Sequence, residues 1–212
     1  IKNLAQQDSV ANEEGNYLNL TPAGDYLVSG SCFSPYLNPY FIKTDTSGEE
    51  LWNIKWPAGA AGFAGRTVFS NNGFIYNATQ LKFYSLPKLP YLLKFNDSGE
   101  VINQYSLMGD TIYNGGALSL LLVDETKMYV GLTWTKDITL FSGYCEIYLT
   151  DTLGSLISKR MLLDEERAPT SIIKSFDGKI VAIGYFVVDD NWDIYLWKMN
   201  ENLEDDTLYT QP

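Results

Sequence analysis

Three carboxylates gathered in one short segment are the strongest candidates for metal binding in this sequence. They are Asp189, Asp190 and Asp193, within the segment YFVVDDNWD at 185–193. Carboxylate oxygens are hard ligands of the kind that Ca²⁺ prefers. The DxDxDG spacing of a calcium-binding loop is absent, and an acidic loop in water explains the same residues. We therefore expect no cofactor, with Ca²⁺ at these three carboxylates as the one candidate ion.

Aromatic residues in four separate segments are the candidates for ligand binding. They are Tyr36, Tyr84, Trp134 and Trp192. Aromatic rings offer flat apolar faces that stack on sugars and anchor protein partners. These residues would bind carbohydrate or protein if the fold brings their segments to one face. The alternative is that the rings cap strands and fill the interior of the fold.

The absence of histidine limits the chemistry that this chain can perform. None of its 212 residues is histidine, which excludes Ser-His-Asp and Cys-His catalysis and histidine-ligated zinc. A catalytic site would depend on carboxylates, tyrosine or lysine. Among 26 Asp and Glu residues no pair stands out. The sequence alone therefore favours a protein that is not an enzyme.

Charge and composition narrow the range of partners. The chain has 15 Lys and Arg against 26 Asp and Glu, a net charge of −11, and such a surface repels phosphate backbones. No segment is apolar for the ~18 to 20 residues that a membrane-spanning helix requires. We therefore expect that the protein neither binds nucleic acid nor inserts into a membrane. The two cysteines, Cys32 and Cys145, can pair or stay as separate buried thiols.

One pattern of residues occurs four times along the chain. The four copies are YFIKTDTSG at 40–48, YLLKFNDSG at 91–99, EIYLTDTLG at 146–154 and YLWKMNENL at 195–203. We call the shared Asp or Asn the anchor residue: Asp45, Asn96, Asp151 and Asn200. The anchors are separated by 96−45=51, 151−96=55 and 200−151=49 residues. Lysine recurs two positions before three of the anchors, which indicates a structural role for it.

Each anchor predicts a tight turn between two strands. Asp or Asn followed by Gly three positions later is typical of a type I turn closed by a glycine at positive φ, which joins antiparallel strands as a hairpin. Leu203 takes the place of that glycine in the fourth copy. A second hairpin precedes each anchor, with turns at 21–24, 71–73, 124–126 and 176–178. Each repeat is therefore expected to be a meander of four strands.

Four-stranded units that recur about every 50 residues predict an all-β, β-propeller-like fold with four four-stranded antiparallel blades. An incomplete arc of a larger propeller is the alternative. A polar segment at 1–16 would precede a single domain at 17–212. Its blades would lie at about 17–57, 66–108, 116–163 and 169–210.

The pattern strand–Lys-x-Asp-x-x-Gly–strand with Trp soon after, as in FIKTDTSGEELW, resembles secreted bacterial β-propeller-like repeat proteins. Many members of that family carry a C-terminal sorting domain for type IX secretion and surface attachment. The resemblance covers about residues 17–209 and is clearest in the first two repeats. It implies a propeller fold and an extracellular or cell-surface location.

The sequence leaves three functions open. The first is a non-catalytic binding module at the cell surface, which recognises protein or glycan through the loops between the second and third strands of each repeat. The second is a structural spacer without a ligand. The third is a carboxylate-dependent hydrolase or lyase, which requires acidic side chains to converge in a cleft.

Overall fold

The structure is a computed structural model that describes most of the chain. The described ranges are 12–33, 37–56, 60–83, 88–107, 114–137, 142–163, 167–188 and 191–206. Every regular element in these ranges is a β-strand. No helix long and apolar enough to cross a membrane occurs in this part of the chain.

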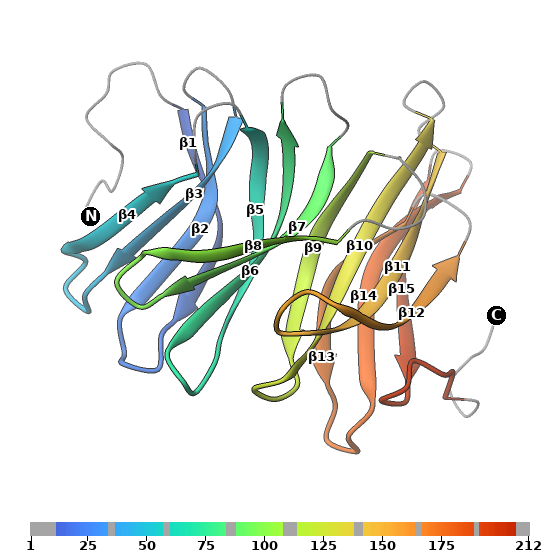
Figure 1. The fold of residues 1–212 in the computed structure, drawn as a ribbon. Helices are drawn as coiled ribbons and strands as arrows, with labels where there is room; N and C mark the ends of the chain where they lie inside the picture. Colours follow the sequence, from blue (N-terminus) through green and yellow to red (C-terminus); the bar gives the residue numbers. More distant parts are fainter. Residues whose placement is uncertain are drawn as a thin grey trace.

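The strands form four antiparallel sheets in chain order (Figure 1). The first sheet comprises β1 (Asn12–Leu20), β2 (Tyr26–Phe33), β3 (Leu37–Thr44) and β4 (Glu50–Lys55). The second comprises β5 (Ala60–Phe69), β6 (Phe74–Phe83), β7 (Leu89–Asn96) and β8 (Val101–Ser106). The third comprises β9 (Asn114–Leu122), β10 (Lys127–Asp137), β11 (Ser142–Asp151) and β12 (Leu156–Leu163). The fourth comprises β13 (Arg167–Lys174), β14 (Ile180–Val188) and β15 (Asn191–Met199).

The sheets are the blades of a β-propeller, and the predicted fold class is confirmed. The first strands of successive sheets lie beside one another, β1 with β5, β5 with β9 and β9 with β13, and so surround a common axis. In the fourth blade the described chain has three strands. Asp205 forms an isolated antiparallel β-bridge with Met199. This bridge lies at the place where the fourth strand begins in the other three blades. The first blade starts at Asn12, earlier than the predicted boundary at residue 17, because β1 pairs with β2 as far as Phe33.

The predicted anchor turns are present in all four repeats. The Oδ1 atom of each anchor accepts the backbone N–H four residues later: Asp45 from Glu49 (2.8 Å), Asn96 from Glu100 (2.9 Å), Asp151 from Ser155 (2.7 Å) and Asn200 from Glu204 (3.0 Å). The glycines that close the first three turns have φ values of 78° to 84°. Leu203 adopts the same left-handed conformation, φ 66°, and is 3 % exposed. Burial of the Leu203 side chain thus stabilises a left-handed backbone conformation that glycine adopts without strain.

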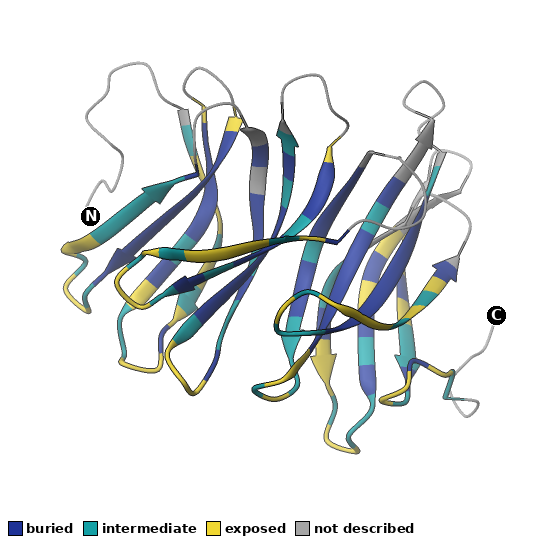
Figure 2. Ribbon diagram, in the orientation of Figure 1, coloured by how far each residue is buried: buried dark blue, intermediate teal, exposed yellow. Residues whose placement is uncertain are grey.

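Three apolar cores lie between consecutive sheets (Figure 2). The position four residues before each anchor shows how they form. In the first three blades this position is buried: the residues there are Phe41, Leu92 and Ile147, which are 1 %, 0 % and 0 % exposed. Each of these side chains packs between its own blade and the next. The equivalent residue of the last blade, Leu196, is 63 % exposed.

The outer faces of the two terminal blades are therefore apolar and open to solvent. Ile173, Ile183 and Ile194 accompany Leu196 on the fourth blade, with exposures of 50 %, 40 % and 77 %. On the first blade, exposed apolar side chains are Leu18, Leu20 and Tyr26. Among the described residues, the first and fourth sheets share no interface like those between consecutive sheets.

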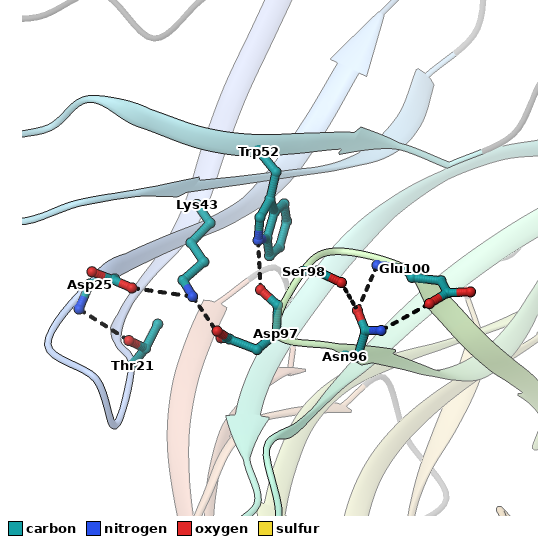
Figure 3. A network of polar contacts seen from close by, with 8 residues as sticks. All are labelled: Thr21, Asp25, Lys43, Trp52, Asn96, Asp97, Ser98 and Glu100. Atoms are coloured by element: carbon teal, nitrogen blue, oxygen red, sulfur yellow. Dashed lines mark hydrogen bonds and ion pairs between the residues drawn. The ribbon is translucent and has the colours of Figure 1, made fainter.

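Polar contacts reinforce the junction between the first two blades (Figure 3). Lys43 Nζ lies 2.6 Å from Asp97 Oδ1 in the next blade and 3.2 Å from Asp25 Oδ2 in its own blade. Trp52 Nε1 donates to the carbonyl oxygen of Asp97 (2.8 Å). Lys43 is only 3 % exposed, so this lysine is a buried interblade contact.

Both cysteines are buried thiols, and no disulfide joins them. Cys32 lies in β2 of the first blade and Cys145 in β11 of the third. They behave as small apolar core residues, which is the common role of a free cysteine.

Candidate functional site

The first strand of each blade carries one irregularity at the equivalent place in the repeat. The pairing with the second strand slips at Asn16 in β1, at Gly65 and Arg66 in β5, at Leu118 in β9 and at Thr170 in β13. The spacings 66−16=50, 118−66=52 and 170−118=52 follow the repeat. Asn16 is exposed and the side chains of Arg66, Leu118 and Thr170 are half-buried. Bulges of this kind re-aim side chains and occur often at functional sites.

The bulge in β5 is held by buried polar groups. Asn77, which is fully buried, donates from Nδ2 to the carbonyl oxygen of Gly65 (2.8 Å) and to Thr67 Oγ1 (2.9 Å). Ser29 of the first blade donates to the same Gly65 oxygen (3.2 Å). A Cβ atom at Gly65 would lie 2.7 Å from the Ala78 oxygen, so only glycine fits this tight approach.

The bulge in β13 is held in a similar way by the third blade. Ser119 Oγ donates to the carbonyl oxygen of Pro169 at 2.6 Å. Gly131 leaves room for this contact, since a Cβ atom there would lie 2.1 Å from Ser119 Oγ and 2.8 Å from Pro169 Cγ. The backbone before Thr170 and Ser171 is therefore positioned by neighbouring residues of the adjacent sheet.

Arg66 and Ser171 meet across the axis. Arg66 Nη1 donates to Ser171 Oγ at 2.9 Å. The second and fourth blades are not neighbours, because β9 lies between β5 and β13 in the order of inner strands. A contact between them must therefore pass on the axial side of β9. We call Arg66 and Ser171 the axial pair.

The axial arginine differs from several other buried or half-buried cations of this chain. Lys43 contacts Asp25 and Asp97, Lys198 contacts Asp177, and Arg160 contacts Asp205. Within the described residues, Arg66 has no carboxylate partner. Its charge is therefore available at the centre of a molecule whose net charge is −11.

A separate pocket of about 180 Å³ lies between the third and fourth blades, at the end where the hairpin turns are. Lys127, Lys174, Asp124 and Glu201 are among its lining residues. Tyr129 also lines it and donates from its hydroxyl to the carbonyl oxygen of Glu201 (2.6 Å). Burial and the nearby Glu201 charge raise the pKa of Tyr129, so this hydroxyl stays a hydrogen-bond donor at neutral pH.

The structure describes part of the predicted aromatic set. Trp134 lies in β10, is 1 % exposed and stacks on Tyr144 with ring centroids 6.4 Å apart. Its ring is part of the core between the second and third blades and is inaccessible to a ligand. Trp192 lies in β15, opposite Val187. Tyr36 and Tyr84 lie outside the described residues.

The predicted metal ligands are described only in part as well. Asp193 is an exposed residue of β15, opposite Phe186, whereas Asp189 and Asp190 lie outside the described residues. No group of three Cys, Asp or Glu side chains that could hold a metal ion occurs in the described ranges. Calcium binding at these three aspartates stays a prediction.

Sequence reasoning missed the axial pair. Arg66 was placed at the start of the second blade as an ordinary strand residue. The available signal was the doublet Gly65-Arg66, which interrupts the alternation of β5 at the same place in the repeat as Asn16, Leu118 and Thr170. No sequence signal pointed to Ser171 as its partner.

Comparisons with known proteins support the fold. By sequence, no family model and no curated protein matches the chain. By structure, the chain is similar to an ulvan lyase of polysaccharide lyase family PL25, with a TM-score of 0.61 and 12 % identity over 93 % of this chain and 54 % of the lyase. It is also similar to an endo-arabinase from Bacteroides thetaiotaomicron, with a TM-score of 0.65 and 10 % identity over 95 % of this chain and 80 % of the arabinase.

A third match is a protein of unknown function from Bacteroides caccae, with a TM-score of 0.53 and 17 % identity over 90 % of this chain and 62 % of that protein. The chain thus spans just over half the length of the ulvan lyase and less than two thirds of the Bacteroides caccae protein. At these identities the shared feature is the propeller fold.

The expectation that this chain is not an enzyme was wrong on this evidence. Its fold is shared with a polysaccharide lyase and an endo-arabinase. The physical reason for the error is that the absence of histidine excludes only histidine-dependent chemistry. Carboxylate, tyrosine and arginine groups can still bind and cleave a glycan.

Proposed function

We propose that this protein acts on polysaccharide, which it binds at the propeller axis and at the adjoining loops between the second and third strands of each blade. The observation that carries the proposal is the match of four consecutive blades, over more than nine tenths of the chain, to a polysaccharide lyase and an endo-arabinase. The inner-strand bulges add a reason to look at the axis, because they bring the axial pair together there.

The proposal includes an extracellular or cell-surface location, since long polysaccharides do not cross membranes unaided. It agrees with the resemblance of the repeats to secreted propeller-like proteins. Protease treatment of intact cells of the source organism, followed by detection with an antibody, tests the location. Degradation of the protein on intact cells is expected, and full protection would contradict this part of the proposal.

Binding and cleavage are measured separately. Affinity electrophoresis against ulvan, arabinan and polygalacturonate, with dextran as a control, reports binding. Absorbance of unsaturated sugar products reports lyase activity, and reducing ends without that absorbance report hydrolysis. Retardation or product formation with at least one of the three polymers is expected. A folded protein that neither binds nor cleaves any of them would overturn the proposal.

A further inference from the structure

We propose that the axial pair binds the anionic group of an acidic sugar, either a uronate carboxylate or a sulfate ester. This inference rests on the proposed action on polysaccharide and names the class of sugar. Its structural basis is a half-buried guanidinium that projects from a fixed bulge, contacts a serine across the axis and has no carboxylate partner among the described residues.

The donors of the axial pair suit an oxyanion. A guanidinium has five N–H donors in a planar fork, which matches the oxygens of a carboxylate or sulfate. In the structure one donor, on Nη1, is used by Ser171 Oγ. That serine oxygen accepts the hydrogen bond, so its own hydroxyl hydrogen can donate to a ligand. An anion beside Arg66 would therefore meet donors from both β5 and β13.

No carboxylate of the described residues compensates the charge of this cation. Lys43, Lys198 and Arg160 are neutralised by aspartates of their own or a neighbouring blade. The axial arginine lacks such a partner, and an excess of acidic residues elsewhere repels anions from the rest of the surface. An acidic glycan would consequently find a favourable electrostatic contact at the axis.

Hydrogen bonds position the backbone of Arg66 in the absence of a ligand. Asn77 and Ser29 hold the Gly65 carbonyl, and Asn77 also bonds the Arg66 carbonyl oxygen at 3.2 Å. A side chain on such a fixed backbone loses less conformational entropy on binding than one on a mobile loop.

The test compares oligosaccharides of equal length by calorimetry: oligogalacturonate for the carboxylate, carrageenan oligosaccharides, which carry sulfate esters and no carboxylate, for the sulfate, and neutral arabino-oligosaccharide. The variants are Arg66→Gln and Ser171→Ala. Arg66→Lys retains the charge without the fork. Lys179→Gln is the control, since it removes one charge from a residue beside the turn at 175–178 that belongs neither to the axial pair nor to the pocket lining. Thermal unfolding verifies that each variant is folded.

We expect the unmodified protein to prefer an anionic ligand over the neutral one. Arg66→Gln should weaken anionic binding by about tenfold or more, the usual effect of losing a charge-assisted hydrogen bond. Arg66→Lys should lose less, and Lys179→Gln should change nothing. Which anionic oligosaccharide binds more tightly distinguishes carboxylate from sulfate. Equal anionic binding by Arg66→Gln and the unmodified protein, or a preference for the neutral ligand, would overturn the inference while leaving the proposed function intact.

Failure of the proposed function is separable from failure of this inference. If no oligosaccharide binds, the action on polysaccharide is wrong. Anion binding at the axial pair is then measured by adding glucuronate or inorganic sulfate and following the NMR chemical shift of the Arg66 Nε–H group. A saturable shift that is absent in Ser171→Ala supports an anion site at the axial pair. No shift at tens of millimolar ligand overturns it.

Discussion

Lys43 and Asp97 connect the first blade to the second through a contact of 2.6 Å between Nζ and Oδ1 (Figure 3). The lysine side chain is 4 % exposed and the aspartate side chain is 63 % exposed. The lysine charge is therefore removed from water, and it depends on Asp97 and Asp25 for compensation. Burial lowers the pKa of Lys43, but the hydrogen bonds with Asp97 and Asp25 outweigh it, so the pKa is raised above the ordinary value.

Asp97→Ala should lower the free energy of unfolding by about 1–3 kcal/mol, because it leaves a buried ammonium with one partner. Urea denaturation measures the change. In a Lys43→Met background the same substitution should cost under about 0.5 kcal/mol, since no buried charge remains. Equal losses in both backgrounds would show that the two residues are not coupled.

The second and last repeats predict losses of different size for the same substitution. Leu92→Ala removes a side chain that is fully buried between the second and third blades and should cost about 2–5 kcal/mol. Leu196→Ala, at the equivalent position of the fourth blade, should stay within about 0.5 kcal/mol because the side chain is 63 % exposed. Chemical denaturation of both variants measures the two losses in the free energy of unfolding. A comparable loss for Leu196→Ala would mean that this face is covered in solution.

Alanine substitutions at two turn glycines distinguish the cost of backbone strain from the cost of a steric clash, because the two glycines have nearly the same backbone conformation. Gly73 and Gly99 have φ values of 83° and 84°. Alanine at Gly73 meets nothing within 4 Å, whereas a Cβ atom at Gly99 would lie 2.9 Å from Trp52 Cδ2. Gly73→Ala should cost about 1 kcal/mol for the left-handed conformation. Gly99→Ala should cost clearly more in thermal or urea unfolding, and the NMR signal of the Trp52 Nε1–H group should shift because the ring has to move.

Asp177 should titrate at unusually low pH. Hydrogen bonds from Lys198 and Ser175, with Nζ 2.6 Å from Oδ2, lower the pKa of its carboxyl below the ordinary 3.8. A lowered pKa in the folded state means that the stabilising contribution is present above pH 3.8 and is lost as the pH falls further through the folded-state pKa. NMR titration of the carboxyl carbon measures it. Lys198→Met should return the pKa toward 3.8, and an unchanged pKa in that variant would rule out Lys198 as the main cause.

The sequence predicted the propeller repeat because its signals are local. An anchor such as Asp45 bonds the backbone within four residues of itself, and a glycine such as Gly48 closes the same turn. These contacts need no distant partner, so the residue types and their spacing were sufficient. Leu203 shows the limit of this reasoning, because only the packing around it explains a leucine at positive φ.

The aromatic candidates show why the site was harder to predict. Trp134 occupies a segment that the repeat pattern assigned to a loop, but β10 continues through it to Asp137 and buries the ring. Composition does not distinguish an aromatic residue that caps a strand from one that binds a ligand. The difference depends on how far each strand extends and on what the neighbouring blade places over it.

The sequence by itself determined the strands, their turns and the period that stacks them into blades, since these follow from interactions among residues close together in the chain. Only the tertiary structure decided which residues share the axis. Arg66 and Ser171 are separated by 105 positions, and their contact depends on the angles between three consecutive sheets and on two bulges held by neighbouring blades. Those angles result from the packing of many side chains at once, which no short pattern of residues encodes.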